Sequence, residues 1–365
     1  MKWLLAATAV LFACAHGPTG AGADAAGRAD GVERLAVPAP SLAGSLLPNR
    51  PTQPALVFLP AGYHGSRRAY PVVYYLPGFT TSVDEYVDGT YGFRFDRLVA
   101  AMAGRQLIVV VVNGRNALGG SFYVDSPVTG RWESYVADDV IPFVEARFRI
   151  ARGRDCRGIA GESMGGFGAL HMAMRRPDRF AAVYALSPTL FDERGLEDSG
   201  FLSRPFLDAY RSDAARLRRG PPDQAVARFV HFMDALFATG RRFDYLRALA
   251  YAYAAAVAPA PDRGPPFSAR DEAARLRAGL GDLAIEIGAH EAALRRMRGI
   301  ALDIGRADHF AWIRRGARRF AALLAERGIR HRLLEHDGGH VDHLGERIER
   351  EALPFFARTL CPASG

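Results

Sequence analysis

A serine flanked by glycines stands near the middle of the chain, in the pentapeptide GESMG at residues 161–165. A short strand-like run, Cys156 to Ala160, precedes it, and an alanine-rich helical pattern follows it. This combination is typical of a nucleophile elbow, a sharp strand-to-helix turn that exposes a serine oxygen for attack on a carbonyl carbon. The turn places the serine in an unfavourable backbone conformation, and glycines two positions away remove side chains that would collide. The sequence therefore predicts Ser163 as a nucleophile.

An acid and a base must accompany such a serine, and in enzymes built on this turn the acid comes next along the chain, before the histidine base. Asp308 follows the apolar segment 299–305, in a loop before a long helical pattern, where a catalytic group is expected. Asp303 is the alternative acid, but it lies inside the apolar segment and would alternate there with core residues. We therefore predict Asp308 as the acid that orients the histidine.

His340 is the predicted base. It stands in the sequence DGGHV, between the strand-like run 330–335 and the last helical pattern of the chain. The two glycines before it leave room for a substrate, which distinguishes it from the other histidines nearby. Those histidines are expected to be surface or capping residues, with the last of them already inside the final helix: His309, His331, His336 and His343.

Two backbone amides are predicted to stabilise the negative oxygen that forms when the serine attacks. The amide of Met164 is one, because the turn directs the first N–H groups of the following helix toward the site. The amide of Phe79 is the other, because Pro77 and Gly78 end a strand-like run and glycine lets the backbone approach the substrate. An ordinary Pro-Gly turn is the alternative, and the presence of Ser163 favours the functional interpretation.

Strand-like and helical runs alternate around these residues. Several strand-like runs are continuously apolar, as expected for central parallel strands covered on both faces. The alternation predicts an α/β fold with a doubly wound, mostly parallel sheet. The expected strands are Ala55–Leu59, Val72–Leu76, Leu107–Val112, Arg157–Ala160, Ala182–Leu186, Ile300–Ile304 and Arg332–Glu335. The expected helices are 93–103, 134–148, 165–175 and 312–327.

Residues 196–298 differ from the rest, since they contain helix-forming runs, proline-rich interruptions and almost no β-branched run. We predict a mostly helical insertion that caps the active site, with a helical ornament that does not touch the substrate as the alternative. The expected helices include 223–238, 245–256 and 269–278. Aromatic residues recur there at near-helical spacing, so most are expected to pack in the core, and an apolar acyl pocket would take its lining from the others.

The amino end, residues 1–14, has the form of a secretory signal, in which Lys2 precedes about ten apolar residues, too few to span a bilayer. Two kinds of processing fit this pattern. A small-residue cleavage site lies at Ala13–Ala15, while the sequence LFAC resembles a bacterial lipobox in which Cys14 becomes lipidated, and we favour the lipoprotein. Residues 15–32 would then form a flexible linker. The protein is expected to be exported, as a periplasmic, membrane-anchored or extracellular protein.

Composition indicates one large domain, at residues 33–360. The chain has 365 residues, of which 49% are hydrophobic, enough for a sizeable core.

Its net charge of +8 comes almost entirely from arginines scattered among acidic residues, which is typical of solvated helix faces and not of a nucleic-acid-binding surface. Lys2, the only lysine, is lost with the signal, which excludes Schiff-base and P-loop chemistry, and no metal or organic cofactor is expected. Cys156 and Cys361 could form a disulfide in an oxidising compartment, and two free thiols are the alternative.

Four parts of the sequence resemble the esterase D-like branch of the α/β-hydrolases, which includes S-formylglutathione hydrolases, mycolyltransferases, feruloyl and acetylxylan esterases and enterochelin esterases. They are residues 70–78, 119–123 with 126–130, 160–170 and 303–356, within a similarity that extends over about 33–360. The resemblance implies an α/β-hydrolase fold with Ser163, Asp308 and His340 as catalytic residues. It also implies that Phe79 and Met164 donate their backbone N–H groups to the oxyanion.

Together these features predict an exported serine esterase that cleaves a carboxylic ester through an acyl-enzyme. The expected partner is a small-molecule or glycan-linked ester, with neither a cofactor nor a nucleic acid. The same residues would serve an acyltransferase that uses a sugar or another alcohol in place of water. A non-catalytic hydrolase-fold binding module is an alternative of another class. Thioester hydrolysis is disfavoured, because the S-formylglutathione substrate is cytosolic.

Overall fold

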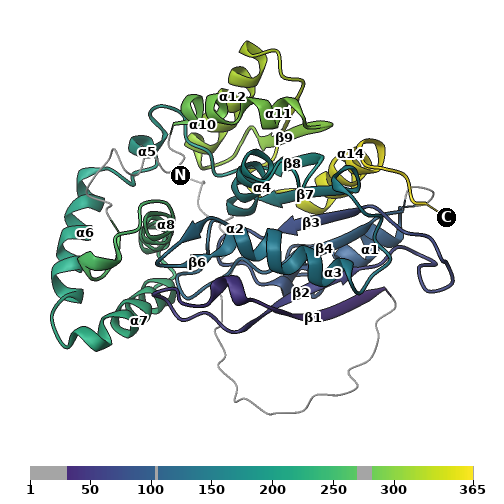
Figure 1. Cartoon of the computed structure of the whole chain (residues 1–365). Coiled ribbons are helices and arrows are strands. Elements are labelled where there is room, and N and C mark those ends of the chain that lie inside the picture. Colours follow the sequence, from purple (N-terminus) through teal and green to yellow (C-terminus); the bar gives the residue numbers. More distant parts are fainter. Residues whose placement is uncertain (1–30, 103–105, 269–281, 365) are drawn as a thin grey trace, which may run out of the picture.

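The computed structural model describes residues 31–102, 106–268 and 282–364. Three expected features lie outside the described residues: the signal peptide (1–14) with Cys14, nearly all of the linker 15–32, and the helix at 269–278. In the described part of the chain, one eight-stranded sheet runs through the molecule with helices on both faces (Figure 1). The predicted α/β fold is confirmed.

The sheet is mixed, with a long parallel part. The strands are β1 (Val32–Pro38), β2 (Thr52–Phe58), β3 (Val72–Leu76), β4 (Ile108–Val112), β5 (Asp125–Ser126), β6 (Gly130–Arg131), β7 (Arg157–Glu162), β8 (Ala182–Leu186), β9 (Gly299–Gly305) and β10 (Arg332–His336). Their order in the main sheet is β1–β2–β4–β3–β7–β8–β9–β10, and β5 pairs separately with β6. β2 is antiparallel to both β1 and β4, and every later pair is parallel.

Helices flank the sheet on both faces. They are α1 (Phe95–Ala100), α2 (Trp132–Ser134) continuing through a π-helical stretch (Tyr135–Val140) into α3 (Ile141–Glu145), α4 (Met164–Arg175), α12 (Ala311–Glu326), α13 (Leu344–Arg347) and α14 (Leu353–Thr359). On β3, Val72 and Tyr74 pack in one apolar cluster with α3, α4 and α12, whereas Val73 and Tyr75 pack in a second cluster with α1, α13 and α14. Burial on both faces explains why β3, β4 and β8 are apolar at every position.

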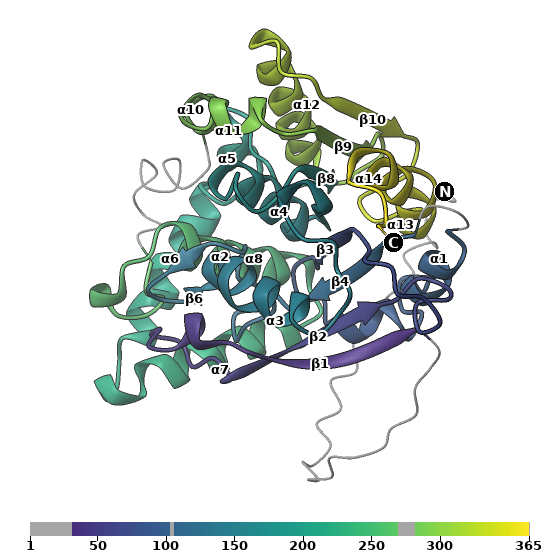
Figure 2. The same cartoon turned by 45° about the vertical axis from the view of Figure 1, so that its right-hand side comes forward.

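The insertion contributes a group of helices of its own. They are α5 (Gly195–Asp198), α6 (Arg204–Leu217), α7 (Ala225–Ala238), α8 (Arg242–Val257), α10 (Leu283–Ala289) and α11 (Glu291–Arg295). α6, α7 and α8 gather beyond one end of the sheet, at the left of Figure 1, whereas α10 lies against α12 and α11 against α4 (Figure 2). α6, α7 and α8 therefore lie apart from the helices that cover the sheet, whereas α5 also packs against α12.

β1 is an element that the sequence analysis did not predict. It begins at Val32, the last residue assigned to the linker, and pairs with β2 along its whole length. As an edge strand it buries only Val37, and its apolar and charged residues do not alternate regularly. The seven expected strands are all present, with ends that differ from the expected ones by up to three residues.

Cys156 and Cys361 form a disulfide, with Cα atoms 4.8 Å apart. The bond joins the turn before β7 to the segment after α14. Phe356 and Leu360 also pack over Gly158 of β7, where a Cβ would lie 2.5 Å from the first and 3.3 Å from the second. The pairing that the sequence left open is therefore present, and the carboxyl-terminal helix is fixed to the central strand.

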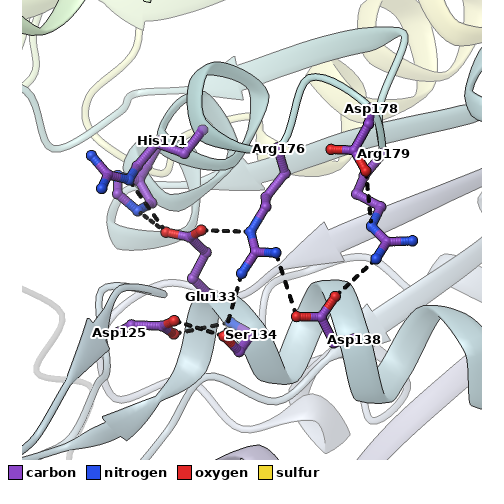
Figure 3. Close-up of polar contacts among 9 residues, drawn as sticks. Asp125, Glu133, Ser134, Asp138, His171, Arg176, Asp178 and Arg179 are labelled. Carbon is purple, nitrogen blue, oxygen red and sulfur yellow. Dashed lines mark hydrogen bonds and ion pairs between the residues drawn. The ribbon is translucent and has the colours of Figure 1, made fainter.

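A buried carboxylate ties α4 to the neighbouring helix. Glu133 of α2 accepts hydrogen bonds from His171 Nε2 at 2.8 Å and from Arg176 Nε at 2.6 Å (Figure 3). Burial raises the pKa of Glu133, but the hydrogen bonds and charges of His171 and Arg176 outweigh it and lower the pKa to about 2. Arg176 and Arg179 also pair with Asp138 (Figure 3). This network fixes the second half of α4 to α2.

Replacing Glu133 by glutamine is expected to lower the free energy of unfolding by about 1–3 kcal/mol near neutral pH, because charge-assisted hydrogen bonds are lost. Since the pKa is depressed in the folded state, this stabilisation is complete above the ordinary value of 4.5 and is lost as the pH falls toward about 2. Urea unfolding at about pH 7 and about pH 3.5 measures the effect. The gap between wild type and Glu133→Gln should narrow at the lower pH, and a constant gap would contradict this assignment.

Candidate active site

Ser163 occupies the turn between β7 and α4, with φ of 54° and ψ of −115°. A positive φ is unfavourable for a residue with a side chain and accompanies a sharp change of chain direction. The flanking glycines are required by space, because a Cβ at Gly161 would lie 2.5 Å from the carbonyl oxygen of Leu76 and one at Gly165 would lie 1.7 Å from it. The elbow is therefore packed directly against the end of β3.

Three side chains from distant parts of the chain meet at the carboxyl ends of parallel strands. His340 Nε2 lies 2.9 Å from Ser163 Oγ, and His340 Nδ1 lies 2.7 Å from Asp308 Oδ2. Ser163 follows β7, Asp308 lies between β9 and α12, and His340 lies between β10 and α13. Asp308 is only 2% exposed, whereas Ser163 and His340 are partly exposed. This geometry can pass the serine proton to the imidazole while a buried carboxylate holds the other ring nitrogen.

Phe310 connects the acid to the histidine. Its backbone N–H donates to Asp308 Oδ1 at 2.8 Å, so both carboxylate oxygens have a partner. Its ring meets the ring of His340 edge-on, with centroids 5.0 Å apart. The same residue therefore fixes the orientation of the carboxylate and limits the rotation of the imidazole.

The two predicted amide donors lie at matching positions just beyond the ends of two neighbouring strands. Leu76 of β3 pairs with Gly161 of β7 in the parallel register. Phe79 and Met164 each follow that pair by three residues. Neither N–H group donates to another group within the described residues. Both amides are thus available to a negative oxygen beside the serine.

Asp303, the alternative acid, makes a different contact. Its buried carboxylate on β9 pairs with Arg347 at the end of α13. Arg347 also donates to Ser187 Oγ at 3.0 Å and to the carbonyl oxygen of His340 at 3.4 Å. This buried arginine supports the histidine loop from behind. No local pattern predicts its role, because nothing in the sequence separates it from the many exposed arginines.

The four other histidines near the site make separate contacts. His309 follows the acid, with its ring 6.0 Å from that of His340, and partial burial followed by the charge of His340 lowers its pKa. His331 and His336 hydrogen-bond to backbone groups within their own turns. His343 precedes α13 with φ of 56°, so the prediction that it lies inside the final helix is wrong by one residue.

Two aromatic residues of the insertion reach the predicted oxyanion donor. The rings of Phe237 on α7 and Tyr245 on α8 lie 6.0 and 5.7 Å from the ring of Phe79, centroid to centroid. A Cβ at Gly119 would lie 2.8 Å from Phe237, so this glycine permits the approach. Four other aromatic residues of the insertion are buried: Phe229, Phe232, Tyr251 and Tyr253. Phe79, Phe237 and Tyr245 together form what we call the aromatic wall.

Among the described residues, no group of three or more His, Cys, Asp or Glu side chains is arranged to hold a metal ion. The same part of the chain contains no helix with the length and hydropathy needed to cross a membrane.

The sequence matches the model of one protein family, described as "Putative esterase", over residues 49–343. An esterase of Mycobacterium tuberculosis is 38% identical over 128 residues, which cover 35% of this chain and 27% of that protein. The match therefore spans about a quarter of the length of this curated relative.

Solved structures of two hydrolases are similar to this fold. A ferulic acid esterase has a TM-score of 0.58 at 19% identity, over 90% of this chain and 98% of that one. A fluorophosphonate-binding serine hydrolase of Staphylococcus aureus also has a TM-score of 0.58, at 15% identity, over 89% of this chain and 98% of that one. These likenesses confirm the expected α/β-hydrolase fold.

Asparagine at position 308 is expected to lower the turnover of a p-nitrophenyl ester by about 10⁴-fold, because the imidazole would be held in the wrong tautomer. The melting temperature should stay close to that of wild type, since Asp308→Asn keeps the side-chain shape. Asp303→Asn is the matched control. It should lower the melting temperature, because it weakens the buried pair with Arg347, while its turnover stays well above that of Asp308→Asn. Full activity in Asp308→Asn together with its loss in Asp303→Asn would show that the acid is misassigned.

Proposed function

The chain belongs to this esterase family, and on that premise we propose that it is an exported serine esterase that cleaves a carboxylic ester through an acyl-enzyme. The observation that carries the proposal is the hydrogen-bonded chain from Ser163 through His340 to the buried Asp308. Such a chain, beside two amides that donate to no acceptor among the described residues, suits acyl transfer to a serine oxygen.

In the first half of the proposed reaction, Ser163 Oγ bonds to the ester carbonyl carbon while His340 Nε2 accepts its proton. Asp308 holds the tautomer with hydrogen on Nδ1 and stabilises the imidazolium that forms. The carbonyl oxygen becomes negative and accepts hydrogen bonds from the amides of Phe79 and Met164. The imidazolium then protonates the leaving alcohol as the C–O bond breaks, and the acyl group remains on the serine.

In the second half, water attacks the acyl carbonyl and His340 takes a proton from it. The same two amides stabilise the second oxyanion, and the serine oxygen leaves with the proton that the imidazolium returns. Partial exposure of Ser163 and His340 supports the access of water. An alcohol in place of water would complete an acyl transfer with the same groups.

The aromatic wall supports an ester whose group on that side is apolar or aromatic, because the partly exposed rings of Phe237 and Tyr245 lie against the buried ring of Phe79, whose amide is a proposed oxyanion donor. A panel of p-nitrophenyl esters of increasing acyl length, with aryl, sugar and siderophore esters, tests this preference. Product analysis with and without an added alcohol separates hydrolysis from acyl transfer.

A fluorophosphonate probe is expected to label the wild-type protein at Ser163 and to leave Ser163→Ala unlabelled, because only an activated serine oxygen reacts with it. Ester hydrolysis by this variant should fall by more than about 10³-fold. Ser66→Ala, in the loop that leads into β3, is the matched control and should behave as wild type. A wild-type protein that neither reacts with the probe nor hydrolyses esters would refute the proposal and favour a binding module.

We also propose export. The signal pattern at residues 1–14 supports it, and so does the disulfide between Cys156 and Cys361, since such bonds persist mainly in oxidising compartments. The proposed anchor is a lipid on Cys14, with the following residues as a tether between the membrane and the domain.

Cys14→Ser is expected to move the protein from the membrane fraction to the soluble fraction and to abolish the incorporation of labelled palmitate, because the thiol is the site of acylation. Cell fractionation and metabolic labelling in a bacterial host measure both effects. A protein that is already soluble and unlabelled as wild type would instead favour cleavage at Ala13–Ala15 without an anchor.

A further inference from the structure

Glu162, the last residue of β7, is a buried carboxylate that the proposed reaction does not use. It immediately precedes Ser163 and is 2% exposed. Its Oε1 accepts hydrogen bonds from the amide of Gly78, at 2.7 Å, and from the hydroxyl of Tyr86. Gly78 in turn precedes Phe79, whose amide is the predicted oxyanion donor. One carboxylate therefore connects the nucleophile turn to the loop that carries this donor.

Burying the charged form of Glu162 costs free energy, and the groups that donate to it are neutral, so no positive charge offsets this cost. Burial raises its pKa to about 7, although the nearby hydroxyls of Tyr86 and Tyr75 and the amide of Gly78 act to lower the pKa. An apolar side chain of similar length would avoid this cost. Packing alone therefore does not account for a carboxyl group at this position, and the bond to Gly78 offers a reason for it.

The peptide unit between Pro77 and Gly78 is held at both ends. Its carbonyl oxygen accepts a hydrogen bond from Tyr123 Oη at 3.0 Å, and its N–H donates to Glu162. Because a peptide unit is planar, holding the oxygen and the N–H fixes the orientation of the whole unit. We call Glu162 and Tyr123 the 77–78 clamp.

A second fixed peptide unit lies just beyond Phe79. The N–H of Thr80 donates to the carbonyl oxygen of Gly119 at 2.8 Å. The unit that carries the Phe79 N–H is therefore confined between two units whose orientations are set. A Cβ at Gly78 would lie 3.2 Å from Glu162 Oε1, so glycine allows the carboxylate its close approach.

We propose that Glu162 is a positioning residue for the oxyanion: by accepting the Gly78 N–H, it directs the Phe79 N–H at the oxygen that becomes negative. This inference rests on the proposed esterase function. It requires an acceptor atom at position 162 and not a negative charge, because a glutamine oxygen can accept the same N–H. Without an acceptor the 77–78 unit can rotate, which weakens a bond made chiefly in the tetrahedral state.

Glu162→Met removes the acceptor and keeps a side chain of similar length. We expect kcat to fall by about 30- to 100-fold with KM within about twofold, because the lost bond belongs to the transition state. Glu162→Gln keeps an acceptor, so its kcat should be at least about tenfold higher than that of Glu162→Met. The affinity for a phenylboronic acid, which forms a tetrahedral adduct with the serine, should fall in Glu162→Met by the same factor as kcat.

Glu145→Gln is the matched control, since it alters a partly buried glutamate that pairs with Arg157 at the start of β7, at the opposite end of that strand from the site. It should lower the melting temperature and leave kcat and the boronate affinity unchanged. Tyr123→Phe removes only the hydroxyl at the other end of the 77–78 clamp. It should lower kcat by about 3- to 30-fold with KM unchanged, and it replaces Glu162→Met in the test if that variant does not fold.

A folded Glu162→Met with kcat within twofold of wild type would overturn the inference, and so would a Glu162→Gln as impaired as Glu162→Met. If Glu162→Met does not fold, an unchanged kcat in Tyr123→Phe overturns it. None of these results touches the proposed esterase function. That function fails only if the wild-type protein neither hydrolyses esters nor reacts at Ser163.

Discussion

The parallel pairing of β3 with β7 is the constraint on which the site depends. Leu76 and Gly161 are the last paired residues of these strands, and the chain turns directly after both. The space between the turns is so small that a Cβ at Gly165 would lie 1.7 Å from the carbonyl oxygen of Leu76. Because the pairing of the two strands ends at the same level, the proposed nucleophile and both proposed amide donors come together without long loops. The histidine and its acid then need only reach this point from strands further along the same sheet edge.

Buried polar contacts support the two loops and the helix that surround the site. Arg347, paired with Asp303, supports the loop that carries the histidine. Glu133 fixes the helix that follows the nucleophile, and Glu162 holds the loop on the other side. These groups hydrogen-bond to backbone atoms of the loops and to other side chains, including Ser187, Tyr86, His171 and Arg176. None of these supporting contacts involves the serine oxygen, the imidazole or the two amides.

The proposed catalytic groups could be selected from the sequence because their signals are local. Ser163 is marked by its glycines, and Asp308 and His340 are marked by their places in loops after apolar runs. The central strands were found for the same reason, whereas β1, a partly exposed edge strand with mixed residues, was missed. Glu162 and Arg347 had no local signal. One is the variable position of G-x-S-x-G and the other is an arginine on a helix, and their contacts exist only once distant segments have folded together.

The disulfide between Cys156 and Cys361 closes a covalent ring across 205 positions of sequence. The serine, its acid, its histidine and the whole helical insertion lie inside this ring. A protease that cuts one peptide bond of the insertion would therefore leave two fragments still attached, the first with the serine and the second with the other two groups. Such a nicked molecule would migrate as one species on a gel without reductant and as two once a thiol is added. Continuity of the backbone through the insertion is thus not what keeps the halves of the site tethered.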